Sequence, residues 1–476
     1  MILEHLTDIV GAKNIITNKD DMAPFLEDWR GNYKGDATAI LLPTNTEMVS
    51  SILKFADEND LYIVPQGGNT GLVGGGIPDA SGRMFVLSLS RMNAIRDISA
   101  DNRSIVVEAG CILQNIHEAA EAHDLYFPLN LAAKGSCSIG GNLSTNAGGI
   151  NVLRYGNTRD LCLGIEVVLM GGKVMNLLTS LRKDNTGYDL KHLFIGAEGT
   201  LGIITAASLK LFPKPKARAT AMAAIPDPQT GVALLSALKN ATGDLVEAFE
   251  LMPGDILKVI GKQFPNYPCP LQPVPEMALL FEIGSSDSNL ATESEDGTVP
   301  IIEKLNAFLA DEFETGRIID AVVAQNETQR QAMWNIREHA PESTKRESWP
   351  VNTDISVAVS DIGHFYADAS RRVKEIDPTV RICGYGHLGD GNIHFNVIER
   401  EGGDEGWAQK RGAIFDAIYE ALYECNGSIS AEHGIGAMKA EQLKLVKDPV
   451  ALEAMHMVKT AFDPKGLLNP GKVLIS

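Results

Sequence analysis

The sequence predicts an α+β protein in which a mixed α/β first region is followed by a region with a large antiparallel sheet covered by helices. Its 476 residues exceed what one ordinary core accommodates, which favours at least two domains. Residues 212–216, Phe-Pro-Lys-Pro-Lys, break regular structure and expose their charges, so we place a boundary there. We expect a first domain over 1–215, a second over 216–425, and a C-terminal segment, 426–476, that returns to the first.

Before this boundary, hydrophobic spacing predicts alternating helices and strands. A helix is expected from Thr44, because Thr44-x-x-Glu47 has the form of a capping box and Val49, Ile52 and Leu53 follow at helical spacing. Another helix is expected at 113–122, and strands are expected at 61–65, 104–108 and 161–170.

After the boundary, candidate strands alternate with longer helical stretches. The strands are expected near 219–225, 245–251, 277–284, 316–323, 353–359 and 392–398. An antiparallel sheet with helices on one face accommodates this order.

Composition and charge exclude several classes of partner. Hydrophobic residues make up 44% and charged residues 22%, as in a folded globular protein. The formal net charge of -19 repels nucleic acids and anionic bilayers, so an anionic substrate needs a local cationic pocket. The six cysteines form no C-x-x-C pair, which indicates a reducing compartment. Without a signal peptide or a transmembrane stretch, we expect a cytoplasmic protein.

Two glycine-rich tracts stand out as candidate ligand sites. Residues 65–76, Pro-Gln-Gly-Gly-Asn-Thr-Gly-Leu-Val-Gly-Gly-Gly, follow a predicted strand and offer bare N–H groups that suit a pyrophosphate, although a flexible surface loop is the alternative. Ile77-Pro78-Asp79 cannot begin the helix that a Rossmann fingerprint requires. The second tract, 135–149, mixes glycines with hydroxyl and amide side chains, so the two tracts together could embrace one dinucleotide.

A histidine cluster predicts a metal site. His387 and His394 flank a Gly-Asp-Gly turn, so a hairpin would bring the two imidazoles together, and Glu432-His433 follows later. Two imidazoles and a carboxylate with an open position are typical of a catalytic first-row metal site, whereas a lone histidine is more often a satisfied polar residue at a turn. Zinc is the first choice, and Mn, Co and Fe stay open.

Four segments together carry a family resemblance. Residues 65–76, residues 135–149 with Arg154-Tyr155-Gly156, residues 196–203 and residues 462–472 resemble the FAD-linked oxidases of the vanillyl-alcohol oxidase type. Within that family they are most similar to the branch of D-lactate and D-2-hydroxyglutarate dehydrogenases. The resemblance implies a two-part FAD-binding domain and a substrate, or cap, domain.

The resemblance also implies how the flavin is held. Some relatives attach it through a histidine where this chain has Asn69, so we expect non-covalent FAD. The expected flavin contacts are Pro65, Gly67, Gly68, Asn69, Thr70, Gly71, Leu72, Gly135, Ser136, Ser138, Gly140, Gly141, Asn142, Thr145, Gly148, Glu198, Gly202, Ile203 and Asn469.

For the chemistry, the resemblance implies that His387, His394 and Glu432 hold the metal and that His433 is the base. Asn396, two residues beyond His394 on the same strand face, is expected to touch the substrate.

Arg337 lies in a segment, 333–338, that resembles the family helix whose arginine grips the substrate carboxylate, with a solvated surface arginine as the alternative. Asn352 stands where dicarboxylate-using relatives have a lysine. Either the substrate is smaller and lactate-like, or Lys345 or Arg346 supplies the missing charge.

We therefore expect FAD-dependent, metal-assisted oxidation of a D-2-hydroxy acid, of the 2-hydroxyglutarate or lactate type, by hydride transfer to flavin N5. The alternatives are a metal-dependent hydrolase or oxygenase without flavin, and a flavin-binding subunit that only relays electrons. The expected electron acceptor is electron transfer flavoprotein or a quinone, and relatives suggest a homodimer.

Overall fold

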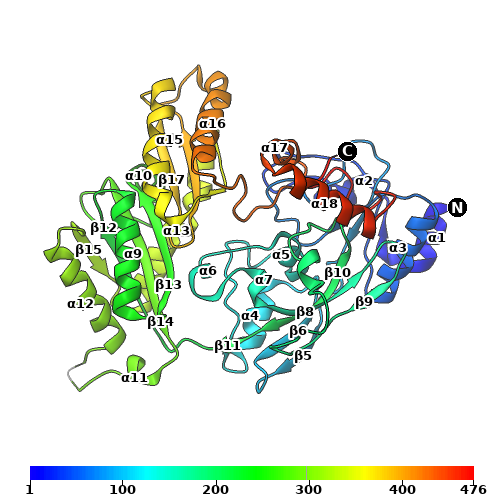
Figure 1. Ribbon diagram of the computed structural model, residues 1–476, viewed down its shortest axis with the longest axis horizontal. Coiled ribbons are helices and arrows are strands. Elements are labelled where there is room, and N and C mark those ends of the chain that lie inside the picture. Colours follow the sequence, from blue (N-terminus) through cyan, green and yellow to red (C-terminus); the bar gives the residue numbers. More distant parts are fainter. Residues whose placement is uncertain (296, 476) are drawn as a thin grey trace. The chain divides into compact units, whose positions relative to one another are not determined.

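The computed structural model describes residues 1–295 and 297–475, and the chain divides into two compact units (Figure 1). The first unit comprises 1–149, 156–214 and 432–476, and the second comprises 150–155 and 215–431. No helix in the described ranges is both long enough and apolar enough to cross a membrane.

The first sheet of the first unit has the strand order β1-β2-β4-β3. Its strands are β1 (Ile15–Ile16), β2 (Ala39–Leu41), β3 (Ile63–Gln66) and β4 (Phe85–Ser88), and β2, β4 and β3 run parallel. Helices α1 (Ile2–Val10) and α3 (Thr46–Glu58) share a hydrophobic core with this sheet. Because β3 ends at Gln66, the first glycine-rich tract begins at the end of a strand of this sheet.

The start of α3 corrects one sequence prediction. The residue that caps the helix is Asn45, whose side chain accepts the N–H of Met48 at 2.9 Å, and Thr44 and Glu47 do not form the predicted capping box. Asn45 is an equally good capping type, and its carboxamide oxygen reaches the same class of free helix N–H. The predicted buried face of the helix is confirmed at Val49, Ile52 and Leu53.

The second sheet of the first unit is antiparallel, with the order β5-β6-β10-β8-β9. The predicted strands at 104–108 and 161–170 are confirmed as β6 and β8, and the central strand β10 was not predicted. The strands are β5 (Ile95–Ser99), β6 (Ser104–Glu108), β8 (Cys162–Val168), β9 (Val174–Asn176) and β10 (Ile203–Lys210), and a short pair joins β7 (Leu125–Tyr126) to β11 (Phe212–Pro213). The other helices of this unit are α2 (Lys19–Met22), α4 (Leu113–Glu121), α5 (Ile139–Thr145), α7 (Thr158–Leu161), α8 (Lys191–Phe194), α17 (Ala440–Val446) and α18 (Pro449–Phe462).

The second unit is built on a seven-stranded antiparallel sheet with the order β15-β12-β14-β13-β17-β18-β16, which confirms the predicted large antiparallel sheet. Its strands are β12 (Ala217–Ala224), β13 (Val246–Pro253), β14 (Met277–Ser285), β15 (Asp320–Val323), β16 (Ile355–Ser356), β17 (Arg381–His387) and β18 (Asn392–Ile398). The helices are α6 (Val152–Tyr155), α9 (Pro228–Thr242), α10 (Gly254–Gln263), α11 (Ser288–Ala291), α12 (Pro300–Glu314), α13 (Glu327–Glu338), α14 (Ala340–Glu347), α15 (Ile362–Ile376) and α16 (Trp407–Glu424).

Helices cover both faces of this sheet, so the expectation of one covered face was wrong. On one face, Phe281 and Phe395 pack against rings from α12 and α15. On the other face, α10, α13 and α14 share a core with Met222, Leu280 and Tyr385. Strand side chains alternate between faces, and every residue of the inner strands β13 and β14 is buried, so each face needs a helical layer.

Candidate functional site

The first unit contains a cavity of about 310 Å³ that is walled by the two glycine-rich tracts. Glu432 and His433 also line this cavity. Among the described residues, the predicted flavin contacts Gly135, Ser136 and Asn469 do not line it. Those that do are Pro65, Gly67, Gly68, Asn69, Thr70, Gly71, Leu72, Ser138, Gly140, Gly141, Asn142, Thr145, Gly148, Glu198, Gly202 and Ile203.

The two tracts approach so closely that glycine is required at the contact. A Cβ at Gly68 would lie 2.1 Å from the Ser136 carbonyl oxygen, and one at Gly67 would lie 2.4 Å from Ser138 Oγ. Any larger residue would therefore force the tracts apart.

Asn69 secures the first tract from the other side. Its φ of 53° is in the left-handed region, and its Nδ2 donates to the carbonyl oxygens of Pro24 at 3.1 Å and Glu27 at 3.0 Å. The position at which the family resemblance implies a possible flavin-linking histidine thus carries an amide side chain that is hydrogen-bonded to the protein itself.

Unsatisfied polar atoms on the cavity wall fit a polar cofactor. Ser138 Oγ and Asn142 Oδ1 are buried and find no hydrogen-bond partner among the described residues. Buried polar atoms are costly unless they are paired, so a ligand with matching donors and acceptors is expected here. The cavity, its glycine-lined wall and these two atoms together fit FAD.

Asn469 supports the cavity without lining it. Its Nδ2 donates to the Gly75 carbonyl at 3.0 Å and to the Glu198 carbonyl at 2.7 Å. The C-terminal segment therefore ties the first glycine tract to the 196–203 segment.

In the second unit, the predicted histidine hairpin is confirmed by β17 and β18. The register pairs Tyr385 with His394 and His387 with Asn392, which puts these four side chains on one face of the sheet. The ring centroids of His387 and His394 lie 5.8 Å apart, and both side chains are buried.

A buried carboxylate lies beside each histidine, and sequence reasoning missed both. Glu250 on β13 is paired in register with His387, and its Oε1 accepts from His387 Nδ1 at 2.7 Å. Asp354 Oδ1 lies 4.0 Å from His394 Nδ1. With Nδ1–H donating to Glu250, His387 Nε2 is left as the acceptor atom of the ring, and Arg337 Nη2 lies 3.4 Å from it.

Glu250 also holds Arg337, the predicted substrate clamp. Arg337 Nε donates to Glu250 Oε2 at 2.6 Å, and its guanidinium carbon lies 4.8 Å from the Tyr385 ring centroid. Arg337 is 7% exposed, so it is not the solvated surface arginine of the alternative interpretation. Burial acts to raise the pKa of Glu250, but the His387 imidazole and the Arg337 guanidinium, which both donate hydrogen bonds to this carboxylate, hold its pKa at about 2.

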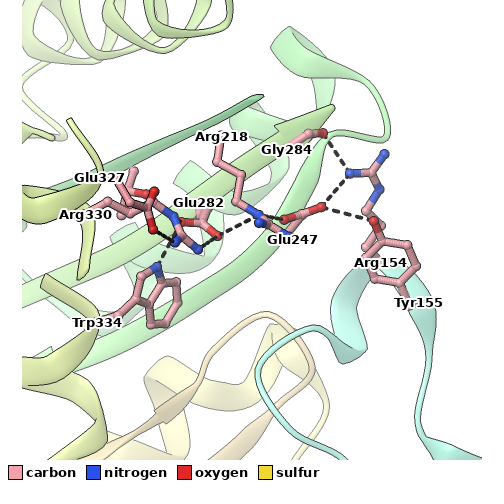
Figure 2. A network of polar contacts seen from close by, with 10 residues as sticks. Arg154, Tyr155, Arg218, Glu247, Glu282, Gly284, Glu327, Arg330 and Trp334 are labelled. Carbon is pink, nitrogen blue, oxygen red and sulfur yellow. Dashed lines mark hydrogen bonds and ion pairs between the residues drawn. The ribbon is translucent and has the colours of Figure 1, made fainter. Parts of the chain in front are cut away.

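A charged network fixes the helix that carries Arg337. Figure 2 shows Glu282 on β14 accepting from Arg330, at 2.6 and 2.9 Å, and from the indole N–H of Trp334, at 2.9 Å, both on α13. Arg218 on β12 continues the network to Glu247 at 2.8 Å. The sheet thus secures α13 just before Arg337.

The short segment 150–155 is hydrogen-bonded to the same network. Arg154 Nη1 donates to Glu247 Oε1 and the Tyr155 hydroxyl donates to the same oxygen, each at 3.0 Å (Figure 2). The Arg154-Tyr155 part of the family motif is therefore bound to β13, the strand that carries Glu250.

The remaining predicted residues fall into three places. Asn396 is buried, and its Oδ1 accepts the Thr353 N–H at 3.2 Å. Asn352 is half-buried in the preceding position, and Lys345 is exposed on α14. Glu432 and His433 belong to the first unit, where His433 Nε2 lies 3.7 Å from Glu432 Oε1.

Comparisons with known proteins match both parts of the chain. Residues 37–178 match the FAD binding domain model, and residues 214–473 match that of the FAD linked oxidases, C-terminal domain. D-2-hydroxyglutarate dehydrogenase, mitochondrial, from Arabidopsis thaliana is 39% identical, covering 99% of this chain and 81% of that protein. D-2-hydroxyglutarate dehydrogenase from Stutzerimonas stutzeri is 34% identical over 99% of this chain and 98% of its own length.

Among solved structures, p-cresol methylhydroxylase shares the fold, with a TM-score of 0.75, 15% identity and coverage of 100% of this chain and 96% of its own. The predicted two-domain fold of the vanillyl-alcohol oxidase type is confirmed, and the flavin-free alternatives are removed by the match to the FAD binding domain. With relatives this similar over nearly the whole of this chain, the protein is an FAD-dependent oxidoreductase, and its chain belongs to the family of FAD-linked oxidases.

Proposed function

We propose that this chain oxidises D-2-hydroxyglutarate to 2-oxoglutarate with FAD and a divalent cation. The observation that carries the substrate is the full-length similarity to proteins named for this activity. The buried Arg337 beside the histidine pair supplies the cationic pocket that a carboxylate substrate needs in a protein of net charge -19.

We propose that His387, His394 and Glu432 hold the cation, with zinc as the first candidate. The support is the donor set and the Glu250 contact that orients His387 Nε2 toward a ligand role. Glu432 directly follows Ala431, whose N–H donates to the Asp354 carbonyl at 3.4 Å, so the chain leaves the second unit at this residue.

Bound FAD would supply the acceptor for the hydride from C2, and a cation held by the two histidines and Glu432 would lower the pKa of the 2-hydroxyl group. Arg337 holds the substrate carboxylate, with its guanidinium oriented by Glu250 and Tyr385. His433 takes the proton from the 2-hydroxyl oxygen. Asn396, fixed by the Thr353 N–H, contacts the bound substrate.

Anaerobic reduction of the bound flavin tests the activity directly. D-2-hydroxyglutarate should bleach the flavin absorbance and form 2-oxoglutarate, and the L-enantiomer is the control. A yellow protein that neither enantiomer nor D-lactate reduces would refute the proposal and favour the electron-relay alternative.

A second candidate, a lactate-type D-2-hydroxy acid, is favoured by the neutral Asn352. Comparing kcat/KM for D-2-hydroxyglutarate and D-lactate decides between the two. If no cationic side chain binds the second carboxylate of D-2-hydroxyglutarate, N352K should raise the ratio of kcat/KM for D-2-hydroxyglutarate to that for D-lactate. If N352K leaves this ratio unchanged, Lys345 or Arg346 is the residue that binds the second carboxylate.

We propose electron transfer flavoprotein or a quinone as the oxidant, and reoxidation rates of the reduced enzyme with each will identify it. The cytoplasmic location and the homodimer stay predictions. All six cysteines are free thiols in the structure.

A further inference from the structure

Glu198 is a buried carboxylate on the cavity wall to which the proposed reaction assigns no chemical step. It is 8% exposed, and its φ of 51° is unusual for a residue with a side chain. Its N–H donates to the Ser144 carbonyl at 2.8 Å, and its carbonyl accepts from Asn469 Nδ2 at 2.7 Å. The backbone is thus held in a strained conformation by two other segments of the cavity, which is a common property of functional positions.

Both oxygens of this carboxylate bind the backbone that follows His433. Oε1 accepts the Ile435 N–H and Oε2 accepts the Gly436 N–H, each at 2.7 Å. Between them and His433 lies Gly434, with a φ of 81°, where an added Cβ would lie 2.7 Å from Glu198 Oε1. The chain at 434–436 therefore wraps closely around one side chain.

The contact is costly to maintain, which argues against an incidental role. Burial raises the pKa of Glu198, whereas the two backbone N–H groups oppose that change. Glu198 also lines the cavity, but each carboxylate oxygen already accepts a short hydrogen bond from the 434–436 backbone. Its carboxylate is thus engaged by the chain itself.

We propose that Glu198 is a positioning residue that sets the place of His433 through the Ile435 and Gly436 amides. Through its own backbone, it links this segment to the second glycine tract at Ser144 and to the C-terminal segment at Asn469. The base and the flavin-binding wall are then held by one residue. This inference rests on the proposed function, in which His433 is the base.

Glu198→Gln tests the proposal in the FAD-loaded enzyme. Glutamine has the same size but presents an NH₂ group to one of the two backbone N–H groups. We expect a fall in kcat of about 10- to 100-fold, since small misplacements of a catalytic group have effects of this size. KM and FAD content should stay near wild type, and the Ile435 and Gly436 amides should exchange hydrogen faster in mass spectrometry.

Glu166→Gln is the matched control. Glu166 is also 8% exposed and lies in the same unit, but its Oε1 accepts from the side chains of Thr46 and Thr205. This variant should leave kcat and the exchange at 435–436 unchanged. If Glu198→Gln does not fold, Gly434→Ala disturbs the same contact from the opposite side and should give the same two changes.

Three results would overturn the proposal: wild-type kcat in Glu198→Gln, unchanged amide exchange, or loss of FAD with a normal reduction rate for the flavin that remains. His433→Asn separates this inference from the proposed function. If His433→Asn turns over normally, the proposed base is wrong. If it is inactive while Glu198→Gln is fully active, only the positioning role fails.

Discussion

Replacing Glu250 by glutamine should weaken substrate capture and metal binding together. Glu250 is 1% exposed and accepts from Arg337 Nε at 2.6 Å and from His387 Nδ1 at 2.7 Å. Glutamine keeps the size and one acceptor, but its NH₂ group must face one of these two donors. A hydrogen bond to a charged group contributes about 1.5–3 kcal/mol, which corresponds to a fall of about 10- to 100-fold in kcat/KM.

The affinity for the metal should fall by a similar factor. Loss of the group that orients a metal-bound histidine lowers metal affinity by about 10- to 100-fold. Metal content after dialysis, measured by mass spectrometry, and kcat/KM with and without added Zn²⁺ report the two effects. FAD content should stay unchanged, because the predicted flavin contacts lie in the other unit.

Glu312→Gln is the control for the loss of a buried acid as such. Glu312 lies near the C-terminal end of α12, is 4% exposed and pairs at 2.6 Å with Arg317, which follows the helix, with no histidine involved. This variant should keep kcat/KM and metal content. The reasoning is refuted if Glu250→Gln binds metal and substrate like wild type, or if Glu312→Gln loses both to the same extent.

Arg337→Lys should raise KM for the hydroxy acid by about tenfold or more, because an ammonium group cannot form the two parallel hydrogen bonds of a guanidinium. An unchanged KM in steady-state assays would show that Arg337 does not bind the substrate. Acid precipitation should release all FAD into the supernatant, because Asn69 replaces the flavin-linking histidine, and a yellow pellet would contradict this. Chelator treatment should remove the cation and abolish turnover while FAD stays bound, and Zn²⁺ or Mn²⁺ should restore activity. Since the pKa of Glu250 is lowered to about 2, its stabilising contribution is present above about pH 4.5 and is lost as pH falls toward 2. The free energies of unfolding of wild type and Glu250→Gln, measured by urea titration, should therefore become equal over that acid range. If the difference between them does not change with pH, the pKa of Glu250 is not lowered.

Local patterns were sufficient where a short segment determines its own structure. The strand at 104–108 and the His387–His394 hairpin were predicted correctly, because alternation and a glycine turn act over a few residues. The helix cap was misplaced by one residue because Thr44 and Asn45 are both good capping types, and only the geometry of the entering chain selects between them.

The carboxylates at the site could have been suspected but not assigned. Glu250 lies between Phe249 and Leu251 in a fully buried strand that also contains Glu247, and an acid in a buried strand is a sign of a partnered charge. Its partners cannot be read from that pattern. They depend on the register of β13 against β17, which pairs Glu250 with His387.

The sequence by itself determined the chemistry that is available: bare glycine backbones for a dinucleotide, an amide at position 69 in place of a linking histidine, and imidazoles beside a turn. These properties belong to residue types and short spacings. Only the tertiary structure decided which groups act together. Glu250 and His387 are 137 residues apart, and Glu198 and Ile435 are 237 apart, so their contacts arise from strand register and chain return, which no local pattern specifies.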